Sequence, residues 1–400
     1  MIKYFNFSTF QLFNFNLQQK TMLYYIGKIY DYTFLRLLSS YVVLLSIGSF
    51  ISAALTWFAL PRLWHRLPHD HGKALTPGGM ASKGKPTGAG LVISLCILPA
   101  LVLVVPFSPS LRVFDEWAIS WLALLPLYLI MLFGYLDDRA EKPWGQLKKG
   151  LLDALCCVFC AFVMSLDGMN NVWLPLTKRE FVVPLWLYLP AATAILFISV
   201  NSLNCSDGVD GLAGSLGIMS LVSLSVLLYL VLGYRPVSEY LLLPHYAGAA
   251  RWAVISTTIG AAYAAYLWYN ASPSQVLMGD AGSRMLGLAI GIAVLATGNP
   301  LLIFVFAPVV FLDGGTGLVK LLLLRLFKRL GFDTTPPGML PRENAPRQTF
   351  LVRKFHAVRF PLHDHCRKNK GWSNEQVLVR FVLVQLLLIP LLFAVFTKVR

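Results

Sequence analysis

Ten apolar segments of the membrane-helix type divide this chain and restrict what it can fold into. From the hydropathy pattern they cover 37–60, 88–106, 117–136, 150–166, 182–202, 212–233, 250–269, 284–298, 300–323 and 376–397. Hydrophobic residues make up 56% of the sequence and charged residues 13%, against about 45–50% and about 25% in soluble domains. We therefore predict an all-α polytopic membrane protein with about ten transmembrane helices.

The basic residues of the loops predict which side of the membrane each loop faces. The connections 61–87, 137–149 and 324–375 are rich in Lys and Arg, whereas the alternate connections carry two basic residues at most. Because cytoplasmic loops retain Lys and Arg, we expect the odd-numbered segments to end in the cytoplasm. Both chain termini are then expected to be periplasmic.

The N-terminal residues 1–21 are rich in aromatic, Asn and Gln residues and contain no basic region followed by an apolar core. They do not read as a cleavable signal peptide, and we expect them to form a poorly ordered extension. Residues 22–400 are expected to form a single ten-helix transmembrane domain. The six cysteines have a spacing that suits neither a zinc site nor a disulfide framework, so we predict buried free thiols.

Polar residues gather in a few places that this orientation assigns to the cytoplasmic side. These clusters cover residues 84–90, 134–139, 201–214, 270–283 and 361–365. Five clusters on one face indicate a shared site there. The basic loop 324–368 has few interleaved aromatic residues, so the chain, despite its net charge of +15, is not predicted to bind nucleic acid.

The stretch 201–214 is the most informative of these clusters. It places Asn201, Asn204, Asp207 and Asp210 at every third position and intersperses Gly208, Gly211 and Gly214. A solvated loop is one interpretation. Polar groups at a membrane edge are costly unless they bind something, and glycine lets backbone approach a ligand closely, so a binding site is favoured.

Two further motifs supply carboxylates at helix ends. Asp137 and Asp138 are adjacent where an apolar segment ends, which suits a general base or a Mg²⁺ ligand; a solvent-facing pair balanced by Arg139 is the alternative. Asp280 lies between two glycines before Ser283 and an apolar segment. Free N–H groups at such a helix start attract phosphate or a metal–phosphate complex, although a simple helix cap is also possible.

The basic and imidazole groups complete the pattern. His363 and His365 flank Asp364, which is weak evidence for zinc but suits hydrogen bonding to phosphate. The lysines near the acids either hold anions or only set topology; they are Lys83, Lys85, Lys148 and Lys149. Together the clusters predict Mg²⁺-dependent phosphoryl transfer, without a Walker, kinase or Rossmann motif.

Several motifs resemble one enzyme family. They are Gly-Tyr-Leu-Asp-Asp at 134–138, Asn-Cys-Ser-Asp-Gly-Val-Asp-Gly-Leu-Ala at 204–213, and Asn270 separated by nine residues from Asp-Ala-Gly-Ser at 280–283. The chain resembles the polyprenyl-phosphate N-acetylhexosamine-1-phosphate transferases from about Met22 onward. The segment 360–372, Phe-Pro-Leu-His-Asp-His-Cys-Arg-Lys-Asn-Lys-Gly-Trp, is similar to the bacterial peptidoglycan branch, the phospho-N-acetylmuramoyl-pentapeptide transferases (translocase I).

This resemblance implies a reaction at the cytoplasmic face of the bacterial inner membrane. Undecaprenyl phosphate attacks UDP-MurNAc-pentapeptide with Mg²⁺ present, giving lipid I and UMP in the first membrane step of peptidoglycan synthesis. The resemblance also implies a homodimer. The catalytic residues carried over are Asp137, Asp138, Asp280 and His363, with Asp280 as the metal ligand. The substrate-binding residues carried over are Thr87, Asn204, Asp207, Gly208, Asp210, Asn270 and His365.

The chain departs from the family pattern in three places. The three consecutive histidines of the family read His363-Asp364-His365. The Lys-x-Gly-Thr-Pro-Thr loop reads Ser-Lys-Gly-Lys-Pro-Thr at 82–87, with Lys83 and Lys85 as possible replacements for the expected lysine. The basic loop after the Asp pair is shorter than usual. The peptide, the choice of base between Asp137 and Asp138, and a one-step or covalent two-step route all stay open.

Two other functions compete with this interpretation. A sister transferase would move GlcNAc-1-phosphate to a polyprenyl phosphate, and only the segment 360–372 argues against it. A non-catalytic transporter or lipid flippase would place ionisable groups near the bilayer midplane, whereas here the acids gather at helix ends. Its best support is Asp-Gly-Gly-Thr-Gly at 313–317, which we interpret as a kink that leans the ninth segment away from the bundle.

Overall fold

The computed structural model describes Leu23 and residues 33–70, 72, 82–105, 116–174, 180–334 and 350–397. The expected N-terminal extension, 1–21, lies outside the described residues. A helix lies at each of the ten apolar segments. These are α4 (Tyr41–Leu63), α5 (Gly90–Val104), α6 (Glu116–Asp138), α7 (Gln146–Leu166), α8 (Leu185–Ser206), α9 (Leu212–Val226), α11 (Ala249–Asn270), α12 (Gly279–Leu295), the broken run from α13 (Ile303–Phe306) to α15 (Thr316–Arg329), and α18 (Asn374–Thr397).

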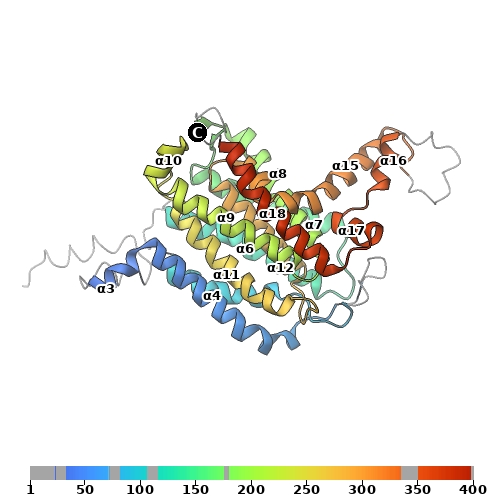
Figure 1. The fold of residues 1–400 in the computed structure, drawn as a ribbon, viewed down its shortest axis with the longest axis horizontal. Coiled ribbons are helices and arrows are strands. Elements are labelled where there is room, and N and C mark those ends of the chain that lie inside the picture. Colours follow the sequence, from blue (N-terminus) through green and yellow to red (C-terminus); the bar gives the residue numbers. More distant parts are fainter. Residues whose placement is uncertain are drawn as a thin grey trace, which may run out of the picture.

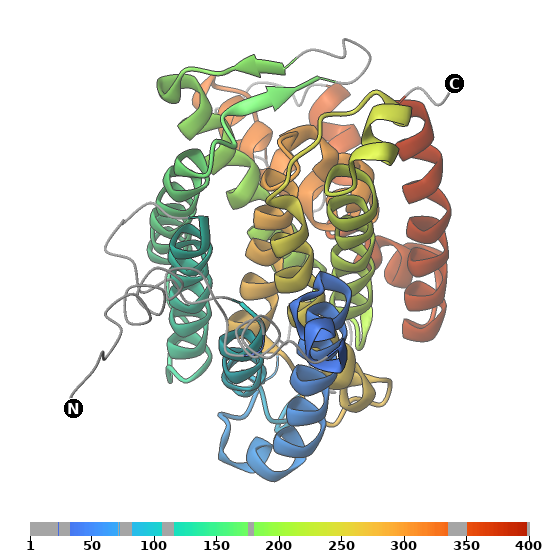
Figure 2. The same cartoon turned by 90° about the vertical axis from the view of Figure 1, so that its left-hand side faces the viewer.

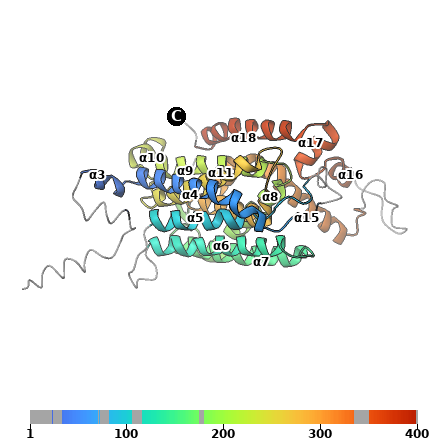
Figure 3. The same cartoon turned by 90° about the horizontal axis from the view of Figure 1, so that it is seen from below.

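Shorter elements connect these helices. They are α3 (Thr33–Arg36), η1 (Leu37–Ser39), η2 (Trp64–Arg66), the π-helical η3 (Leu227–Leu232), α10 (Arg235–Leu241), η4 (Pro300–Leu302), α14 (Pro308–Val310), the π-helical η5 (Phe311–Gly315), α16 (Phe350–Ala357) and α17 (Leu362–Lys370). The long helices run side by side (Figure 2). Helices α6 and α7 form one face of the bundle, and α18 lies on the opposite face (Figure 3).

The described residues include six helices that are long and apolar enough to cross a membrane, or seven if the bent run Pro300–Phe306 and Pro308–Arg329 counts as one span. The chain is therefore a mostly helical, multi-pass membrane protein. Helix α5 is apolar but has only 15 residues.

Helix α12 is the central helix of the bundle. Every residue from Ala281 to Leu295 is buried, and α12 packs against α5, α6, α8 and α9. Glycines permit this close packing: a Cβ on Gly287 would lie 2.7 Å from the Cα of Val200 in α8. Because protein rather than lipid surrounds α12, it can carry polar residues that a lipid-facing helix could not.

The ninth apolar segment bends at a different place from the one expected. The run turns by 90° between Phe306 and Pro308, where Ala307 leaves helical geometry and Pro308 has no N–H to continue the hydrogen-bond ladder. The sequence 313–315, where we expected a kink, forms the end of the π-helical turn η5. Helix α15 does lean out of the bundle, as expected, and projects from it together with α16 (Figure 1).

A small sheet modifies the all-α prediction. Strand β1 (Asn171–Trp173) pairs antiparallel with β2 (Glu180–Val182), with Val172 opposite Phe181. These strands of three residues are too short for a hydropathy pattern to reveal. They lie at the end of the bundle where α10 is also found (Figure 2).

The cysteine prediction is confirmed. All six cysteines are free thiols, and five are buried. Burial raises the pKa of the Cys366 thiol in α17, which disfavours the reactive thiolate.

Candidate active site

The polar site begins where α5, α6 and α12 meet. Two glycines allow their backbones to touch: a Cβ on Gly134 of α6 would lie 2.5 Å from the carbonyl oxygen of Asp280, and one on Gly90 of α5 would collide with the backbone of Gly282. The last residues of α6 therefore lie directly against the first turn of α12. This contact brings the adjacent acids Asp137 and Asp138 to Asp280.

Asp138 caps the start of α12 from a different helix. Its Oδ1 accepts the N–H of Asp280 at 3.0 Å, and its Oδ2 accepts the N–H of Ala281 at 3.1 Å. The first N–H groups of a helix have no partner inside the helix, so this carboxylate satisfies two of them. Gly279 has a φ of +68° and no room for a side chain beside Asp138, which explains the glycine before Asp280.

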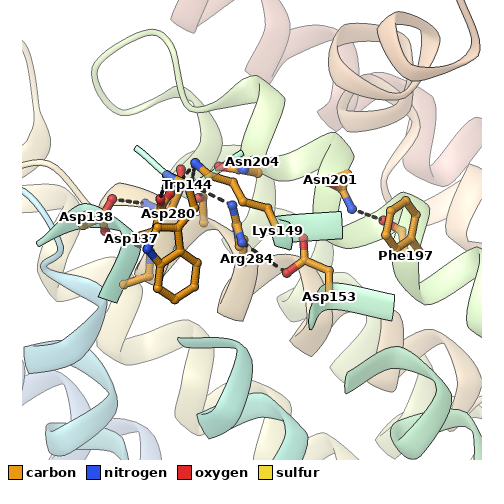
Figure 4. Close-up of polar contacts among 12 residues, drawn as sticks. Asp137, Asp138, Trp144, Lys149, Asp153, Phe197, Asn201, Asn204, Asp280 and Arg284 are labelled. Atoms are coloured by element: carbon orange, nitrogen blue, oxygen red, sulfur yellow. Dashed lines mark hydrogen bonds and ion pairs between the residues drawn. The ribbon is translucent and has the colours of Figure 1, made fainter. Parts of the chain in front are cut away.

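Asp137 and Asp280 share a lysine. The Nζ of Lys149 in α7 pairs with Oδ2 of Asp137 and lies 3.1 Å from Oδ2 of Asp280. The other oxygen of Asp137 accepts the N–H of Trp144 at 2.7 Å. Figure 4 shows Lys149 reaching from α7 towards both acids. Lys149 was expected either to hold anions or only to set the membrane topology. Its two ion pairs place it in the polar cluster.

A second cation, Arg284, pairs with Asp280 from the same helix. Arg284, one turn further along α12, lies 2.7 Å from Oδ2 of Asp280 and 3.2 Å from Oδ1 of Asp153 in α7. The side chains of Arg284 and Asp153 are 3% and 1% exposed (Figure 4). The sequence analysis missed both residues. The available signal was an ionisable residue inside an apolar segment, which by itself indicates function.

The charges of this cluster fit a divalent cation. The cluster has four carboxylates and two cations, which leaves a formal charge of −2. They are Asp137, Asp138, Asp153, Asp280, Lys149 and Arg284. Within the described chain no three His, Cys, Asp or Glu side chains are arranged to hold a metal by themselves. Mg²⁺ usually takes one or two carboxylates and completes its shell with water and substrate phosphates, so this donor set suits Mg²⁺ that arrives with a diphosphate.

The stretch 201–214 connects the acids to the rest of the site. Asn204 near the end of α8 accepts a hydrogen bond from the Ser283 hydroxyl of α12 at 2.8 Å. Asp207 is the C-terminal cap of α8, and Gly211, with a φ of +77°, starts α9. Asn201, by contrast, donates to the Phe197 carbonyl of its own helix.

The residue Asp210 joins the loop before α12 to a lysine. Its Oδ2 accepts the N–H of Ser274 at 3.0 Å and lies 3.7 Å from Nζ of Lys85. Lys85 also donates to the Ser274 hydroxyl at 2.9 Å. Lys83 and Lys85 were the two candidates to replace the lysine of the family's loop, and Lys85 is the one that pairs with Asp210. Lys83 instead lines a pocket of about 400 Å³ together with Asp138.

Thr87 lies in a loop that pairs with the chain just before Asp280. Thr87 is buried, and its N–H bonds the Pro68 carbonyl at 2.8 Å. The N–H of Leu277 bonds the Pro86 carbonyl at 2.8 Å, and that of Ala89 bonds the Leu277 carbonyl at 3.1 Å. These bonds hold the loop of Thr87 against the start of α12.

Asn270 supports the site through protein contacts. Its side chain is 2% exposed; its Oδ1 accepts the N–H of Gly211 at 2.8 Å, and its Nδ2 donates to the Val276 carbonyl at 2.9 Å. The amide therefore joins the end of α11 to two loops, one of which carries Asp210. This geometry gives Asn270 a supporting position, and its contact with substrate stays a prediction.

The two histidines of α17 point to different places. His363 is 2% exposed and contacts Asp313, and a Cβ on Gly208 would lie 2.5 Å from its Nε2. The Nδ1 of His365 accepts the N–H of Arg359 at 3.4 Å. Residues two positions apart on a helix point about 200° apart, so only one can face the stretch 201–214. The structure brings His363 into the site and leaves His365 beside Arg359.

Comparison with known proteins agrees with these motifs. The protein-family model described as glycosyl transferase family 4 matches residues 120–298 of the sequence. The phospho-N-acetylmuramoyl-pentapeptide-transferase of Treponema pallidum (strain Nichols) is 39% identical over 370 residues, which are 91% of this chain and 93% of that protein. The chain belongs to the phospho-N-acetylmuramoyl-pentapeptide-transferase family. The resemblance seen in the motifs is thereby confirmed.

More distant members of the phospho-N-acetylmuramoyl-pentapeptide-transferase family cover the chain to a similar extent. The protein of Gemmatimonas aurantiaca is 31% identical over 379 residues, 88% of this chain and 92% of that protein. The protein of Ruegeria pomeroyi is 27% identical over 387 residues, 92% of this chain and 97% of that protein. The family 4 match includes the acids of α6, α12 and the stretch 201–214 but ends before α17, so the histidine part of the site depends on these longer alignments.

Proposed function

We propose that this protein transfers phospho-MurNAc-pentapeptide from UDP-MurNAc-pentapeptide to undecaprenyl phosphate, giving lipid I and UMP. The observation that carries this proposal is the 39% identity to a phospho-N-acetylmuramoyl-pentapeptide-transferase over 91% of the chain. The acid cluster of Asp137, Asp138 and Asp280 supports it, because a phosphoryl transfer needs this combination of carboxylates and cations.

In this reaction an oxygen of the lipid phosphate attacks the sugar-linked phosphorus of the donor. In the one-step route the bond to UMP breaks as the new phosphate–phosphate bond forms; in the two-step route UMP leaves first, displaced by a carboxylate of the protein. Mg²⁺ held by Asp280 would supply Lewis-acid stabilisation of the diphosphate oxygens. Asp137 and Asp138 would receive the lipid phosphate, and one of them would accept its proton.

The remaining polar residues would bind the donor. Asn204, Asp207, Gly208 and Asp210 would line the pocket for the nucleoside and the sugar phosphate, beside the loop of Thr87. Lys149 and Arg284 would keep the carboxylate of Asp280 in place and offset charge that develops on the phosphates. Asn270 would hold this pocket together, and His365 would lie at its edge.

The position in the cell follows from the loop charges. We propose ten membrane spans, both termini in the periplasm, and a site that faces the cytoplasm of a bacterial inner membrane. The basic loops on the side of the acid cluster support this orientation. A homodimer is proposed on the resemblance alone.

Purified protein in lipid nanodiscs tests this proposal. With undecaprenyl phosphate and UDP-MurNAc-pentapeptide we expect UMP release and a lipid product with the mass of lipid I, lost on Mg²⁺ chelation and restored by Mg²⁺. The same assay with UDP-GlcNAc is the matched control. Turnover of UDP-GlcNAc alone would overturn the proposal in favour of the sister reaction.

Exchange of labelled UMP into the donor separates the two chemical routes. Without lipid acceptor, a one-step transfer gives no exchange, because no intermediate forms. Exchange in the absence of lipid would require a covalent intermediate on the protein.

A further inference from the structure

Asp313 is a fully buried carboxylate in the π-helical turn η5 of the ninth apolar segment. Its exposure is 0%. A buried carboxylate is costly unless hydrogen-bond donors surround it. The donors that approach it come from one residue of another helix, His363 of α17.

The π-helical turn η5 determines where Asp313 points. A Cβ on Gly314 would collide with the Ser202 carbonyl of α8, and one on Gly315 would lie 2.9 Å from the Ser202 hydroxyl. Only glycines allow η5 to press against α8 at Ser202, two residues before Asn204. π-Helical turns are frequent at functional sites, and this one turns Asp313 towards α17.

His363 is held twice by this carboxylate. Its backbone N–H donates to Oδ1 of Asp313 at 2.8 Å, so the acid also caps the first turn of α17. Its ring Nδ1 lies 2.9 Å from Oδ2 and 3.1 Å from Oδ1. Because an ionised carboxylate only accepts hydrogen bonds, Nδ1 must carry the proton.

The opposite ring nitrogen faces the donor-binding stretch. A Cβ on Gly208 would lie 2.5 Å from Nε2 of His363 and 3.1 Å from Cε1. Oδ1 of Asp364 lies 3.9 Å from Nε2 and 3.7 Å from Nη1 of Arg367. Nε2 is therefore directed at Gly208 by the bond on the other side of the ring.

We propose that Asp313 is a positioning residue for the transfer reaction. It fixes the Nδ1–H tautomer of His363 and aims Nε2 at Gly208, where a phosphate of the donor would bind; this rests on the proposed function. Nδ1–H bonds Asp313 in the neutral and the protonated ring alike, and the protonated ring would donate its Nε2–H to a phosphate oxygen. The two buried groups, on η5 and α17, thus act as one unit.

The test is a double-mutant cycle with Asp313→Asn and His363→Gln. Asp313→Asn should lower kcat about 10- to 100-fold, the usual effect of losing such a partner, while KM for undecaprenyl phosphate changes less than about twofold. With Gln at position 363, Asp313→Asn should cost no further activity. Equal losses in both backgrounds, or an unchanged kcat, would overturn the proposal.

A matched control separates positioning from general destabilisation. Asp167→Asn changes another buried, ion-paired aspartate, at the far end of α7, and should leave kcat per folded molecule unchanged. Asp313→Glu keeps the carboxylate and should recover part of the lost kcat, which keeps the test valid if Asp313→Asn folds poorly.

A spectroscopic readout makes the test independent of the reaction. Nitrogen-15 NMR of histidine-labelled protein should show His363 protonated at Nδ1, and Asp313→Asn should change that signal. The same tautomer in both proteins would refute the positioning role. If the wild type instead fails to turn over UDP-MurNAc-pentapeptide, only the proposed function fails, and the tautomer result stands.

Discussion

Two ionic clusters, one buried and one partly exposed, lie at opposite ends of the bundle and differ in charge balance. At the far end, Arg251 of α11 pairs with Asp167 at the end of α7, and the Trp252 Nε1–H donates to the same carboxylate at 3.1 Å. Among the described residues, the ion pair there joins one cation to one acid, and both side chains are 3% exposed. At the site, four acids meet two cations. A balanced pair joins helices, whereas an unbalanced cluster retains the capacity to bind a cation.

Breaking the balanced pair should have the largest effect in this comparison, and on stability alone. Arg251→Met leaves Asp167 buried without its cation and should lower the free energy of unfolding by about 3–5 kcal/mol. Thermal unfolding in detergent measures this. The double variant Arg251→Met/Asp167→Asn should recover most of the loss. A fall in kcat without a change in stability would contradict the structural role.

Removing a charge from the unbalanced cluster should affect activity instead. Asp280→Asn should lower UMP release about 10²- to 10³-fold, equivalent to about 2.7–4 kcal/mol of transition-state stabilisation, and should raise the Mg²⁺ concentration needed for half-maximal rate. Its melting temperature should fall less than that of Arg251→Met. Full product formation by Asp280→Asn would remove the catalytic assignment.

A side chain at Gly208 should sharpen the comparison, because it adds no charge. The Cβ of Gly208→Ala would displace the His363 ring, and a shift of about 1 Å can cost up to about 100-fold in rate. We expect a loss of about 10- to 100-fold in kcat. Gly145→Ala is the control, since nothing lies within 4 Å of a Cβ at Gly145. Equal rates for the two variants would argue against a role for His363 at Gly208.

The smallest effect on stability is expected from the cap of α12. Asp138→Ala leaves the N–H groups of Asp280 and Ala281 without their acceptor and should lower the free energy of unfolding by about 0.5–2 kcal/mol. Hydrogen exchange at these two amides should accelerate. Unchanged exchange there would show that Asp138 does not cap the helix in the membrane.

Much of the site could be predicted because local sequence marked it. The Asp137–Asp138 pair, the stretch 201–214 and Asp280 all stand out as acids beside glycines at the ends of apolar segments, and the structure brings them together. Arg284 and Asp153 did not stand out, because each is a single charge within an apolar run. Their pairing exists only once α7 packs beside α12.

The histidine region is a second case in which the sequence did not reveal which side chains meet. The sequence presents His363 and His365 as equivalent members of one motif, and Asp313 as part of a kink. The helical turn of α17 separates the two histidines, and the wide turn of η5 places Asp313 beside only one of them. Neither result follows from spacing along the chain.

By itself, the sequence determined the membrane class, the helical segments and the family, because hydropathy, loop charge and contiguous motifs are local properties. The tertiary structure alone decided which charges share a partner and which histidine turns inward. Those outcomes depend on how closely glycines let separate helices approach, and that distance has no local signature.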